Sequence, residues 1–319
     1  MCSSRRTWPD EYLATVGVFD GLHPGHRAIL SPLLKASRRT GLPAVLFTFH
    51  PRPVTIFAPE TPPDELTPAP RKWRILAEAG IDRVTVLRFS REFARVEPEE
   101  FLTKVLGAGD GLRGLWIGYD FRFGHRKRGD WEMIESAAKR FGFEAHRVDA
   151  VVREGGPISS SRIRQSLREG RIAEAARLLG RWPDIEGIVV PGRGQGAKLL
   201  VATANLSLPE GQCLPGLGVY AGQAEWEGTY RPAVMNLGRR PSFTDGETVV
   251  PEVHILDFHG DLRDRRLMFR LRERLRDERK FFDINELVDQ VGRDIADVRR
   301  LAIKWGESES GLAPGPDCC

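Results

Sequence analysis

The chain has 319 residues, of which 41% are hydrophobic and 29% are charged, and its formal net charge is +4. This length suits two domains, and the composition is that of a globular protein with well-filled cores. No apolar run approaches the roughly 20 residues that a helix needs to cross a bilayer, and the opening stretch MCSSRRTWPDEYLA lacks the apolar segment of a secretory signal, so we expect a cytoplasmic protein without membrane segments.

The cysteine and charge patterns narrow the protein class further. None of the four cysteines has the spacing of a CxxC motif or of a Cys/His zinc site, which predicts a reducing compartment and no zinc. Basic residues are spread along the chain, and the tightest basic cluster covers only residues 125–128. We therefore expect no nucleic-acid partner, since a mildly basic surface is equally suited to attracting anionic small molecules.

The first half of the sequence alternates short β-rich segments with helical patterns. The predicted strands are 16–19, 44–49, 82–89, 112–118 and, more loosely, 143–152; the predicted helices are 27–39, 71–79, 99–106, 131–141, 160–168 and 172–179, and residues 51–70 form a Pro-rich loop. Strands that recur with helices between them predict βαβ units and a parallel sheet. In such sheets ligands bind where the carboxyl ends of strands lead into helices.

The pattern changes after Arg181-Trp182-Pro183. Short alternating or β-branched segments separated by Gly/Pro turns follow, and they predict an antiparallel sheet or small barrel. Asp283 can cap a final helix, with Glu286 three residues on, and the helix's apolar positions are Ile284, Leu287, Val288, Val291, Ile295, Val298 and Leu301. We predict domains at 1–183 and 184–305, and a disordered tail at 306–319 because its composition is rich in Gly, Pro, Ser and acidic residues.

The stretch VGVFDGLHPGHRAIL (residues 16–30) joins the first predicted strand to the first predicted helix. A helix start offers unpaired N–H groups and a positive dipole end, so it binds anions readily. Gly17, Gly21 and Gly25 allow close approach of the backbone to phosphate, and His23 and His26 could add side-chain donors. Such fixed donors suit nucleotidyl transfer, in which negative charge develops on pyrophosphate. The alternative is that both histidines only cap a helix.

The spacing Gly17-x-Phe19-Asp20-Gly21-x-His23-x-Gly25-His26 resembles the GxFDGxHxGH signature of flavin adenylyltransferases. FTFHPRPV, IGYDFRFGHRKRGD and ISSSRIRQSLREGRI follow in the order of that family. The resemblance implies a Rossmann-like nucleotidyltransferase domain whose catalytic residues include His23, His26 and Arg164. Its implied ATP-binding residues are Gly17, Phe19, Asp20, Gly21, Gly25, Ser160 and Ser161, of which the two serines, with Arg164, would hold the β and γ phosphates.

The same resemblance places Asp120, Phe121 and Phe123 toward the flavin. The alternative for the two phenylalanines is that they are core aromatics. Arg52 departs from the family, in which many members have histidine at this position, and an arginine there could hold phosphate as well.

The second half contains, in order, the stretches VVPGRGQGAKL (residues 189–199), NLGRRPSF, PEVHILDF and LRDERKFFDINEL. These stretches resemble the riboflavin kinase domain of bacterial bifunctional flavin-synthesis enzymes. It implies that Gly192, Gly194 and Gly196 wrap ATP phosphates with their backbone N–H groups and that Thr203 and Asn205 bind Mg²⁺. Glu252 would be the general base for the riboflavin 5′-hydroxyl; its alternative is an ordinary exposed strand carboxylate.

Two departures concern this half: Leu200-Val201-Ala202 replaces the family's Gly-Phe-Pro, and Arg263-Asp264 stands where relatives carry Tyr-Gly. Together the two resemblances imply an ATP-dependent enzyme of FAD biosynthesis that phosphorylates riboflavin to FMN and adenylylates FMN to FAD with release of pyrophosphate. One alternative is a monofunctional FAD synthetase with a degenerate, flavin-binding kinase domain. Two others are a non-catalytic flavin-binding protein and a nucleotidyltransferase acting on another phosphate ester.

Overall fold

The computed structural model describes residues 9–60, 64–191, 203–241, 247–279, 281 and 283–312. They form two compact units, one ending at Ser160 and the other beginning at Ser161. Apart from Ser160 itself, α6 (Ser160–Arg168) and α7 (Ile172–Leu179) therefore count with the second unit. The domain bounds of 1–183 and 184–305 stay a prediction.

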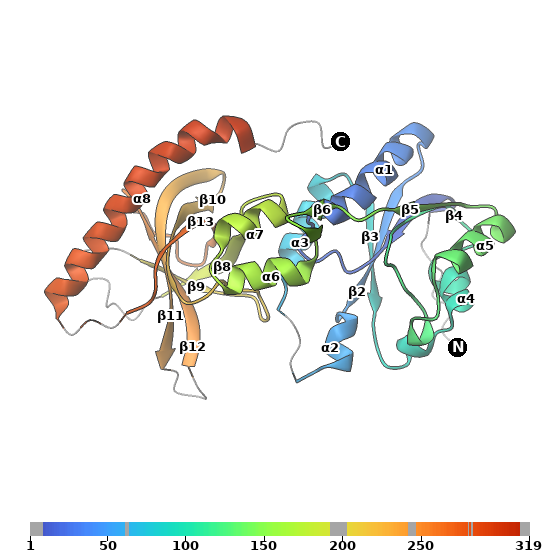
Figure 1. Ribbon diagram of the computed structural model, residues 1–319, viewed down its shortest axis with the longest axis horizontal. Coiled ribbons are helices and arrows are strands. Elements are labelled where there is room, and N and C mark those ends of the chain that lie inside the picture. Colours follow the sequence, from blue (N-terminus) through green and yellow to red (C-terminus); the bar gives the residue numbers. More distant parts are fainter. Residues whose placement is uncertain are drawn as a thin grey trace. The chain divides into compact units, whose positions relative to one another are not determined.

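The first unit is built on a five-stranded sheet with strand order β3-β2-β1-β4-β5 (Figure 1). All neighbouring strands pair in parallel, which confirms the predicted parallel, Rossmann-like sheet. The strands are β1 (Tyr12–Val16), β2 (Ala44–His50), β3 (Arg83–Arg88), β4 (Leu112–Gly118) and β5 (Glu144–Val148). Because β1 is central, the chain that leaves its carboxyl end lies in the middle of the ligand-binding edge expected of such sheets.

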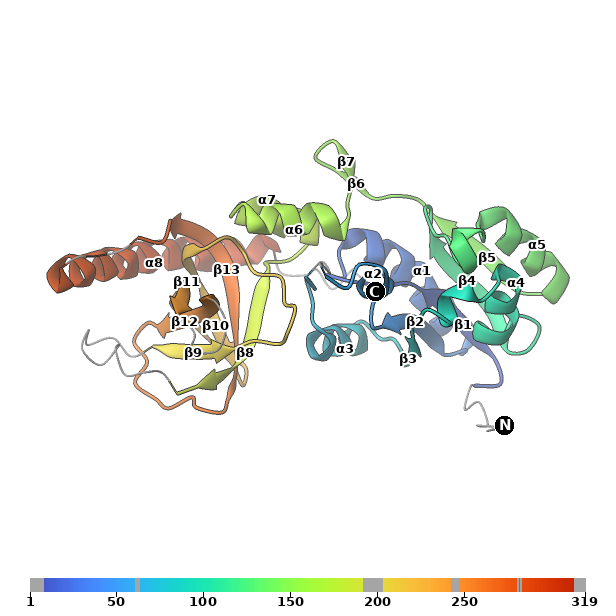
Figure 2. The same cartoon turned by 90° about the horizontal axis from the view of Figure 1, so that it is seen from below.

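Helices cover both faces of this sheet, as can be followed in Figure 2. On one face, α1 (Pro24–Thr40) and α3 (Ala69–Glu78) contribute Leu30, Leu33 and Leu76 to a core with β1, β2 and β4. On the other face, α5 (Trp131–Phe141) and the π-helical turn η2 (Phe101–Val105) form a second core. The remaining short elements are α2 (Pro53–Phe57), η1 (Phe93–Arg95), α4 (Pro98–Glu100), η3 (His125–Lys127) and the hairpin β6 (Val152–Arg153) and β7 (Gly156–Pro157).

The first strand and the first helix differ from their predicted bounds. All five residues of β1 are buried, because helices cover both faces of this central strand. Its sequence therefore lacks the alternation of apolar and polar residues by which a strand can be recognised. Residues 17–19, predicted as strand, instead leave the sheet. The helix begins at Pro24 rather than at residue 27, since proline at the first helical position has its φ already set for the helix.

The second unit is a closed antiparallel barrel with strand order β10-β11-β12-β9-β8-β13, which confirms the predicted barrel. Its strands are β8 (Asp184–Val190), β9 (Ala204–Ser207), β10 (Gly218–Trp226), β11 (Thr229–Pro241), β12 (Glu247–Ile255) and β13 (Arg266–Arg276). Alternation along the strands fills the interior with apolar side chains such as Val253, Phe269 and Leu271, which are at most 1% exposed.

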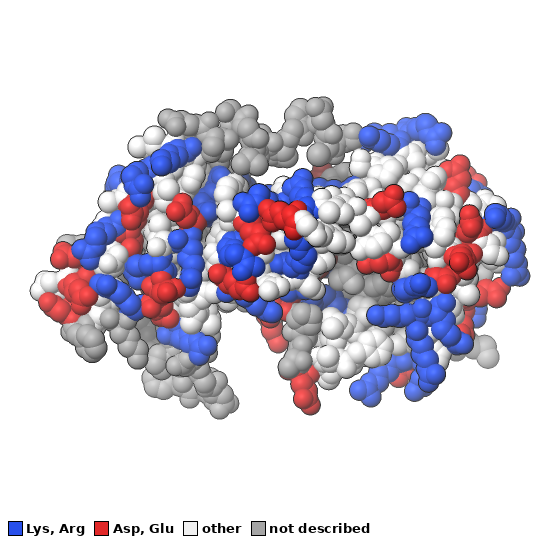
Figure 3. Space-filling model, viewed as in Figure 1, with Lys and Arg blue, Asp and Glu red and all other residues white. Residues whose placement is uncertain are grey.

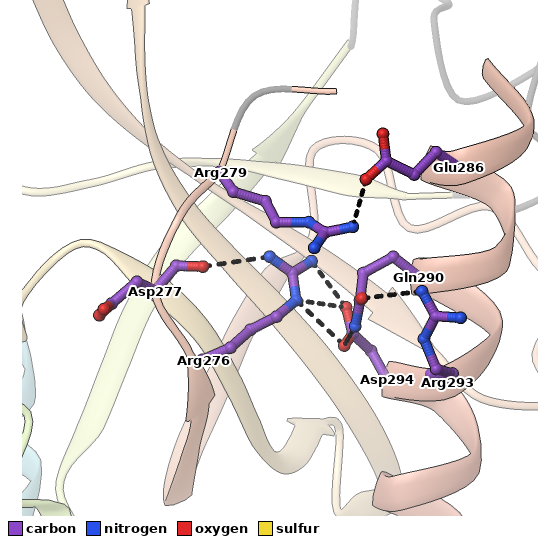
Figure 4. A network of polar contacts seen from close by, with 7 residues as sticks. All are labelled: Arg276, Asp277, Arg279, Glu286, Gln290, Arg293 and Asp294. Carbon is purple, nitrogen blue, oxygen red and sulfur yellow. Dashed lines mark hydrogen bonds and ion pairs between the residues drawn. The ribbon is translucent and has the colours of Figure 1, made fainter. Parts of the chain in front are cut away.

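The helix α8 (Ile284–Leu312) packs along the barrel. Val298, Leu301 and Trp305 contact Ala221 and Leu256, whereas Ile284 and Val288 near its start are exposed. Polar contacts hold the helix as well, as Figure 4 shows. The guanidinium of Arg276 donates from Nε and Nη2 to the carboxylate of Asp294 at 3.1 and 2.8 Å, and Gln290 donates to the same carboxylate at 2.9 Å.

On the face shown in Figure 3, Lys and Arg side chains are intermixed with Asp and Glu over the barrel and its helices. This agrees with the spread of basic residues along the sequence. None of the helices in the described part of the chain combines the length and the apolar character that crossing a bilayer requires.

Candidate active sites

The loop between β1 and α1 has an unusual backbone. Phe19, Gly21 and Leu22 all have positive φ, at 50°, 88° and 48°. Glycine adopts this conformation freely, but phenylalanine and leucine do not. Both side chains are at most 2% exposed and pack into the core beneath α1, so packing holds the strained backbone in place. Strain kept by its surroundings is typical of ligand-binding loops.

The two histidines of this loop lie against each other. The imidazoles of His23 and His26 stack with ring centroids 3.8 Å apart, and the Phe19 ring lies 5.0 Å from His26. His23 occupies the N-cap position of α1, yet its side chain makes no capping hydrogen bond within the described chain. Capping is therefore not what these imidazoles do. A Cβ on Gly25 would come within 3.1 Å of the His23 ring, so glycine permits this stack.

Burial sets the protonation state of His26. Desolvation, followed by the neighbouring His23 and Lys72, holds the pKa of His26 well below its usual value of 6.5. The ring is consequently neutral at pH 7 and keeps one N–H donor. A bound phosphate would oppose this shift, because a negative charge favours the protonated ring.

Asp20 holds the loop between β1 and α1 in place through contacts with other buried segments of the protein. It is 2% exposed, its Oδ1 accepts the backbone N–H of Thr67 at 3.1 Å, and its carbonyl accepts the hydroxyl of Ser160 at 2.9 Å. Arg52 lies 3.8 Å from its carboxylate and also pairs with Glu65, with Nε and Oε1 3.0 Å apart. The arginine that replaces the family's histidine thus contacts two carboxylates.

Sequence reasoning missed Glu65, Thr67 and Lys72, which contact this loop and its partners. Lys72 is 3% exposed, and its Nζ donates to the carbonyl of Val18 at 3.4 Å. All three residues lie more than 40 positions from the loop in sequence. The one signal in the sequence that could have identified any of them was Lys72, a lysine among the apolar residues of an amphipathic helix.

Other predicted residues of this site lie in different places. Ser160 begins α6 and is tied to Asp20, whereas Ser161 is exposed and Arg164 is half-buried in the second unit. The loop after β4 carries Asp120, which is exposed, and the stacked rings of Phe121 and Phe123, with centroids 5.6 Å apart. Because β1 and β4 are parallel neighbours, both loops leave the same edge of the sheet.

The two phenylalanines of this loop are not equivalent. Phe123 is 5% exposed and belongs to the core of the sheet, as the core alternative expected. Phe121 is half-buried and stacks on it. Phe121 is therefore the more accessible of the two aromatic surfaces.

In the barrel, one rung of the sheet brings three polar side chains together. The register pairs Glu252 with Asn205 on one side and with Asn236 on the other. Directly opposed residues point to the same face, with Cβ atoms roughly 5 Å apart. Asn205 is 6% exposed, and its Oδ1 is buried without a hydrogen-bond partner among the described residues. A buried carbonyl oxygen that accepts no hydrogen bond is suited to coordinating a cation that binds together with a ligand.

A pocket of about 180 Å³ lies next in sequence to this rung, since Ala204 and Val253, the strand neighbours of Asn205 and Glu252, line it. Val189, Thr203, Val253, Phe258, Asp261 and Arg263 are among the residues that line it. The guanidinium of Arg263 donates from Nε to Asp261 at 2.8 Å, and these hydrogen bonds lower the pKa of the Asp261 carboxyl to about 2. Asp264 takes φ 62°, where relatives carry glycine, and its N–H donates to the Val189 carbonyl at 2.9 Å. Aspartate tolerates this left-handed conformation better than most residues.

Gly192, Gly194 and Gly196, predicted to wrap ATP phosphates, lie outside the described residues, as do Leu200, Val201 and Ala202.

Comparisons with known proteins cover both units. The family model described as "FAD synthetase" matches residues 6–162, and that described as "Riboflavin kinase" matches residues 179–302. Relatives named "Bifunctional riboflavin kinase/FMN adenylyltransferase" include that of Pseudomonas fluorescens, 36% identical over 91% of this chain and 93% of the relative. The one from Escherichia coli K12 is 37% identical over 88% and 89%, and that from Bacillus subtilis is 30% identical over the same shares.

One solved structure is similar over nearly the whole chain. It is the crystal structure of a protein from Streptococcus pneumoniae named "Macrolide-efflux Protein", with 31% identity and a TM-score of 0.82. The match covers 92% of this chain and 95% of that one, which supports the fold of both units.

Proposed function

The chain belongs to the family of bifunctional riboflavin kinase/FMN adenylyltransferases, and we propose that its two sites divide the two reactions of that family between them. The barrel transfers the γ-phosphoryl group of ATP to riboflavin and forms FMN. The parallel-sheet unit transfers AMP from ATP to FMN and forms FAD, with release of pyrophosphate. The substrates and products are thus riboflavin, FMN, FAD and ATP.

In the adenylyltransferase, the loop of residues 17–23 and the start of α1 bind the triphosphate. The observation that carries this assignment is the stacked pair of His23, which is buried, and His26, which is half-buried, at a helix N-terminus that follows the central strand. An oxygen of the FMN phosphate attacks the α-phosphorus of ATP, and the bond to the pyrophosphate oxygen breaks. Backbone N–H groups and the two imidazoles stabilise the charge that develops on the leaving group. Ser160, Ser161 and Arg164 hold the β and γ phosphates, and Phe121 contacts the flavin.

In the kinase, Glu252 accepts the proton of the riboflavin 5′-hydroxyl as that oxygen attacks the γ-phosphorus. Thr203 and Asn205 would hold Mg²⁺ together with the ATP phosphates, since both offer neutral oxygen ligands and the Oδ1 of Asn205 is buried with its acceptor capacity unused among the described residues. Magnesium would supply neutralisation of phosphate charge. The pocket lined by Thr203 and Val253 takes the nucleotide.

The alternative of a monofunctional FAD synthetase is not favoured. The riboflavin kinase model matches 179–302, and the relatives that align over 88% or more of the chain carry both activities in their names. We also propose a cytoplasmic location, from the cysteine pattern, and small molecules rather than nucleic acid as partners.

The test is a pair of product assays on the purified chain with Mg²⁺. Riboflavin and ATP are expected to give FMN and then FAD. FMN and ATP are expected to give FAD, with one pyrophosphate released for each FAD. The flavins are separated by chromatography with fluorescence detection, and pyrophosphate is measured separately. Conversion of FMN to FAD without conversion of riboflavin would restore the monofunctional alternative. Absence of FAD in both assays would overturn the adenylyltransferase assignment. Chelation of Mg²⁺ is expected to stop riboflavin phosphorylation, because the proposed Mg²⁺ ligands lie in the barrel.

A further inference from the structure

A cluster of three buried charges and one half-buried charge lies against the phosphate-binding loop. Asp20, Arg52 and Lys72 are 2%, 7% and 3% exposed, and the side chain of Glu65 is 21% exposed. The cluster joins the loop after β1, the segment between β2 and α2, and the start of α3, which are distant in sequence. Two cations face two anions, so its formal charge is balanced.

Lys72 is the member of this cluster whose charge is least compensated. An ammonium group has three donors, and the contacts of Lys72 within the described chain are one hydrogen bond to the Val18 carbonyl at 3.4 Å and a Trp73 ring 5.6 Å away. Burial lowers the pKa of Lys72, and Arg52 lowers it further, although Glu65 and Asp20 oppose this. Burying an ammonium in such surroundings is costly, and an apolar side chain would fill the space with less penalty.

The carbonyl that Lys72 contacts belongs to the residue just before the strained part of the loop. Val18 precedes Phe19, whose φ is positive, and the hydroxyl of Thr48 approaches the same carbonyl at 3.4 Å. Two residues after Val18, Asp20 is held by contacts with Thr67 and Arg52. Groups from outside the loop therefore hold Val18 and Asp20, on either side of Phe19, in the loop whose N–H groups bind phosphate in the proposed function.

We propose that Lys72 is a positioning residue for adenylyl transfer: through Val18 it holds the phosphate-binding loop in the conformation that binds ATP, and its charge favours the approach of the triphosphate to that loop. This inference rests on the proposed adenylyltransferase site. It predicts an effect on ATP that is not shared by FMN, because the loop contacts the triphosphate and the flavin surface at Phe121 lies on the neighbouring loop.

The test compares Lys72→Met, which keeps the length of the side chain without its charge, with Lys72→Arg, which keeps the charge. Loss of one charge-assisted hydrogen bond is expected to raise the KM for ATP of Lys72→Met about 10- to 100-fold, with the KM for FMN unchanged and riboflavin phosphorylation by the same sample unchanged. Lys72→Arg is expected to recover most of the loss. Lys104→Met is the matched control, because Lys104 is exposed in the same unit and pairs only with Glu100 among the described residues.

A Lys72→Met protein that forms FAD with the wild-type KM for ATP would overturn the inference and leave the proposed function standing. If Lys72→Met melts at a lower temperature, the assay is run where all variants are folded. An equal change in both KM values, or no recovery with arginine, would then show a packing role and also overturn the inference. Wild-type protein that forms no FAD would instead refute the proposed function.

Discussion

The Glu252→Gln substitution removes the proposed base of the kinase and leaves its surroundings almost intact. Glu252 is half-buried on β12 opposite Asn205 and Asn236, and the ladder that fixes this rung is made by backbone groups. Glutamine has the same length but cannot accept the proton. A general base contributes about 10²- to 10⁴-fold, which is about 3 to 5 kcal/mol of transition-state stabilisation. Riboflavin phosphorylation should fall by that factor.

The assay measures FMN formed from riboflavin and FAD formed from FMN in parallel on one preparation. Glu273→Gln is the control, because Glu273 is an exposed carboxylate on β13 of the same barrel and has no proposed role in the reaction. The control should retain both activities, and Glu252→Gln should still adenylylate FMN. A Glu252→Gln enzyme that phosphorylates riboflavin at the wild-type rate would refute the assignment of the base.

Three further predictions concern particular side chains. His26→Ala should lower FAD formation from FMN by about 100-fold, from the loss of one preorganised donor, while FMN formation from riboflavin persists; His146→Ala, at a half-exposed ring stacked on Trp116, is the control. Because burial lowers the pKa of His26 from 6.5, the unfolded chain binds more protons than the folded one below that pH. The free energy of unfolding, from urea titrations, should therefore fall as the pH is lowered from 7.5 to 5.5, by up to about 1.4 kcal/mol per pH unit from this group, and His26→Ala should lose less. Asp294→Ala leaves the Arg276 guanidinium without its carboxylate and should lower that free energy by about 3 kcal/mol, whereas Asp297→Ala, from an exposed pair with Arg300, should change it by less than about 1 kcal/mol.

The parallel sheet could be predicted because strand-like segments recur with helical patterns between them, and the barrel because apolar and polar residues alternate between turns and so reflect which faces are buried. The strand 112–118 and the helix 131–141 have the predicted bounds. The short helix α2 was missed inside a Pro-rich loop, where five residues give too little periodicity to detect. The strand β1 was misplaced because all its residues are buried, which removes the alternation.

The candidate site was predictable in its local part only. The spacing of His23 and His26 could be read directly, since both lie within one turn of the same helix start. The partners of Asp20 could not, because Arg52 and Thr67 reach it through the fold across 32 and 47 positions. Asp20 was expected to bind ATP, and that role stays a prediction; its buried carboxylate contacts the backbone and a guanidinium.

The departures from the family pattern that fall within the described residues have local compensation. Arg52 brings a charge that histidine would not always carry, and Glu65 and Asp20 both lie close enough to balance it. Asp264 occupies a left-handed position that suits glycine, and its backbone bond to Val189 keeps the turn at the pocket. Arg263, in place of a tyrosine, is paired with Asp261, so these two charges of the pocket wall balance each other. A pocket wall whose turn is held by a backbone bond and whose charges are paired can still accept a nucleotide, and for this reason we expect kinase turnover rather than a barrel that only binds flavin.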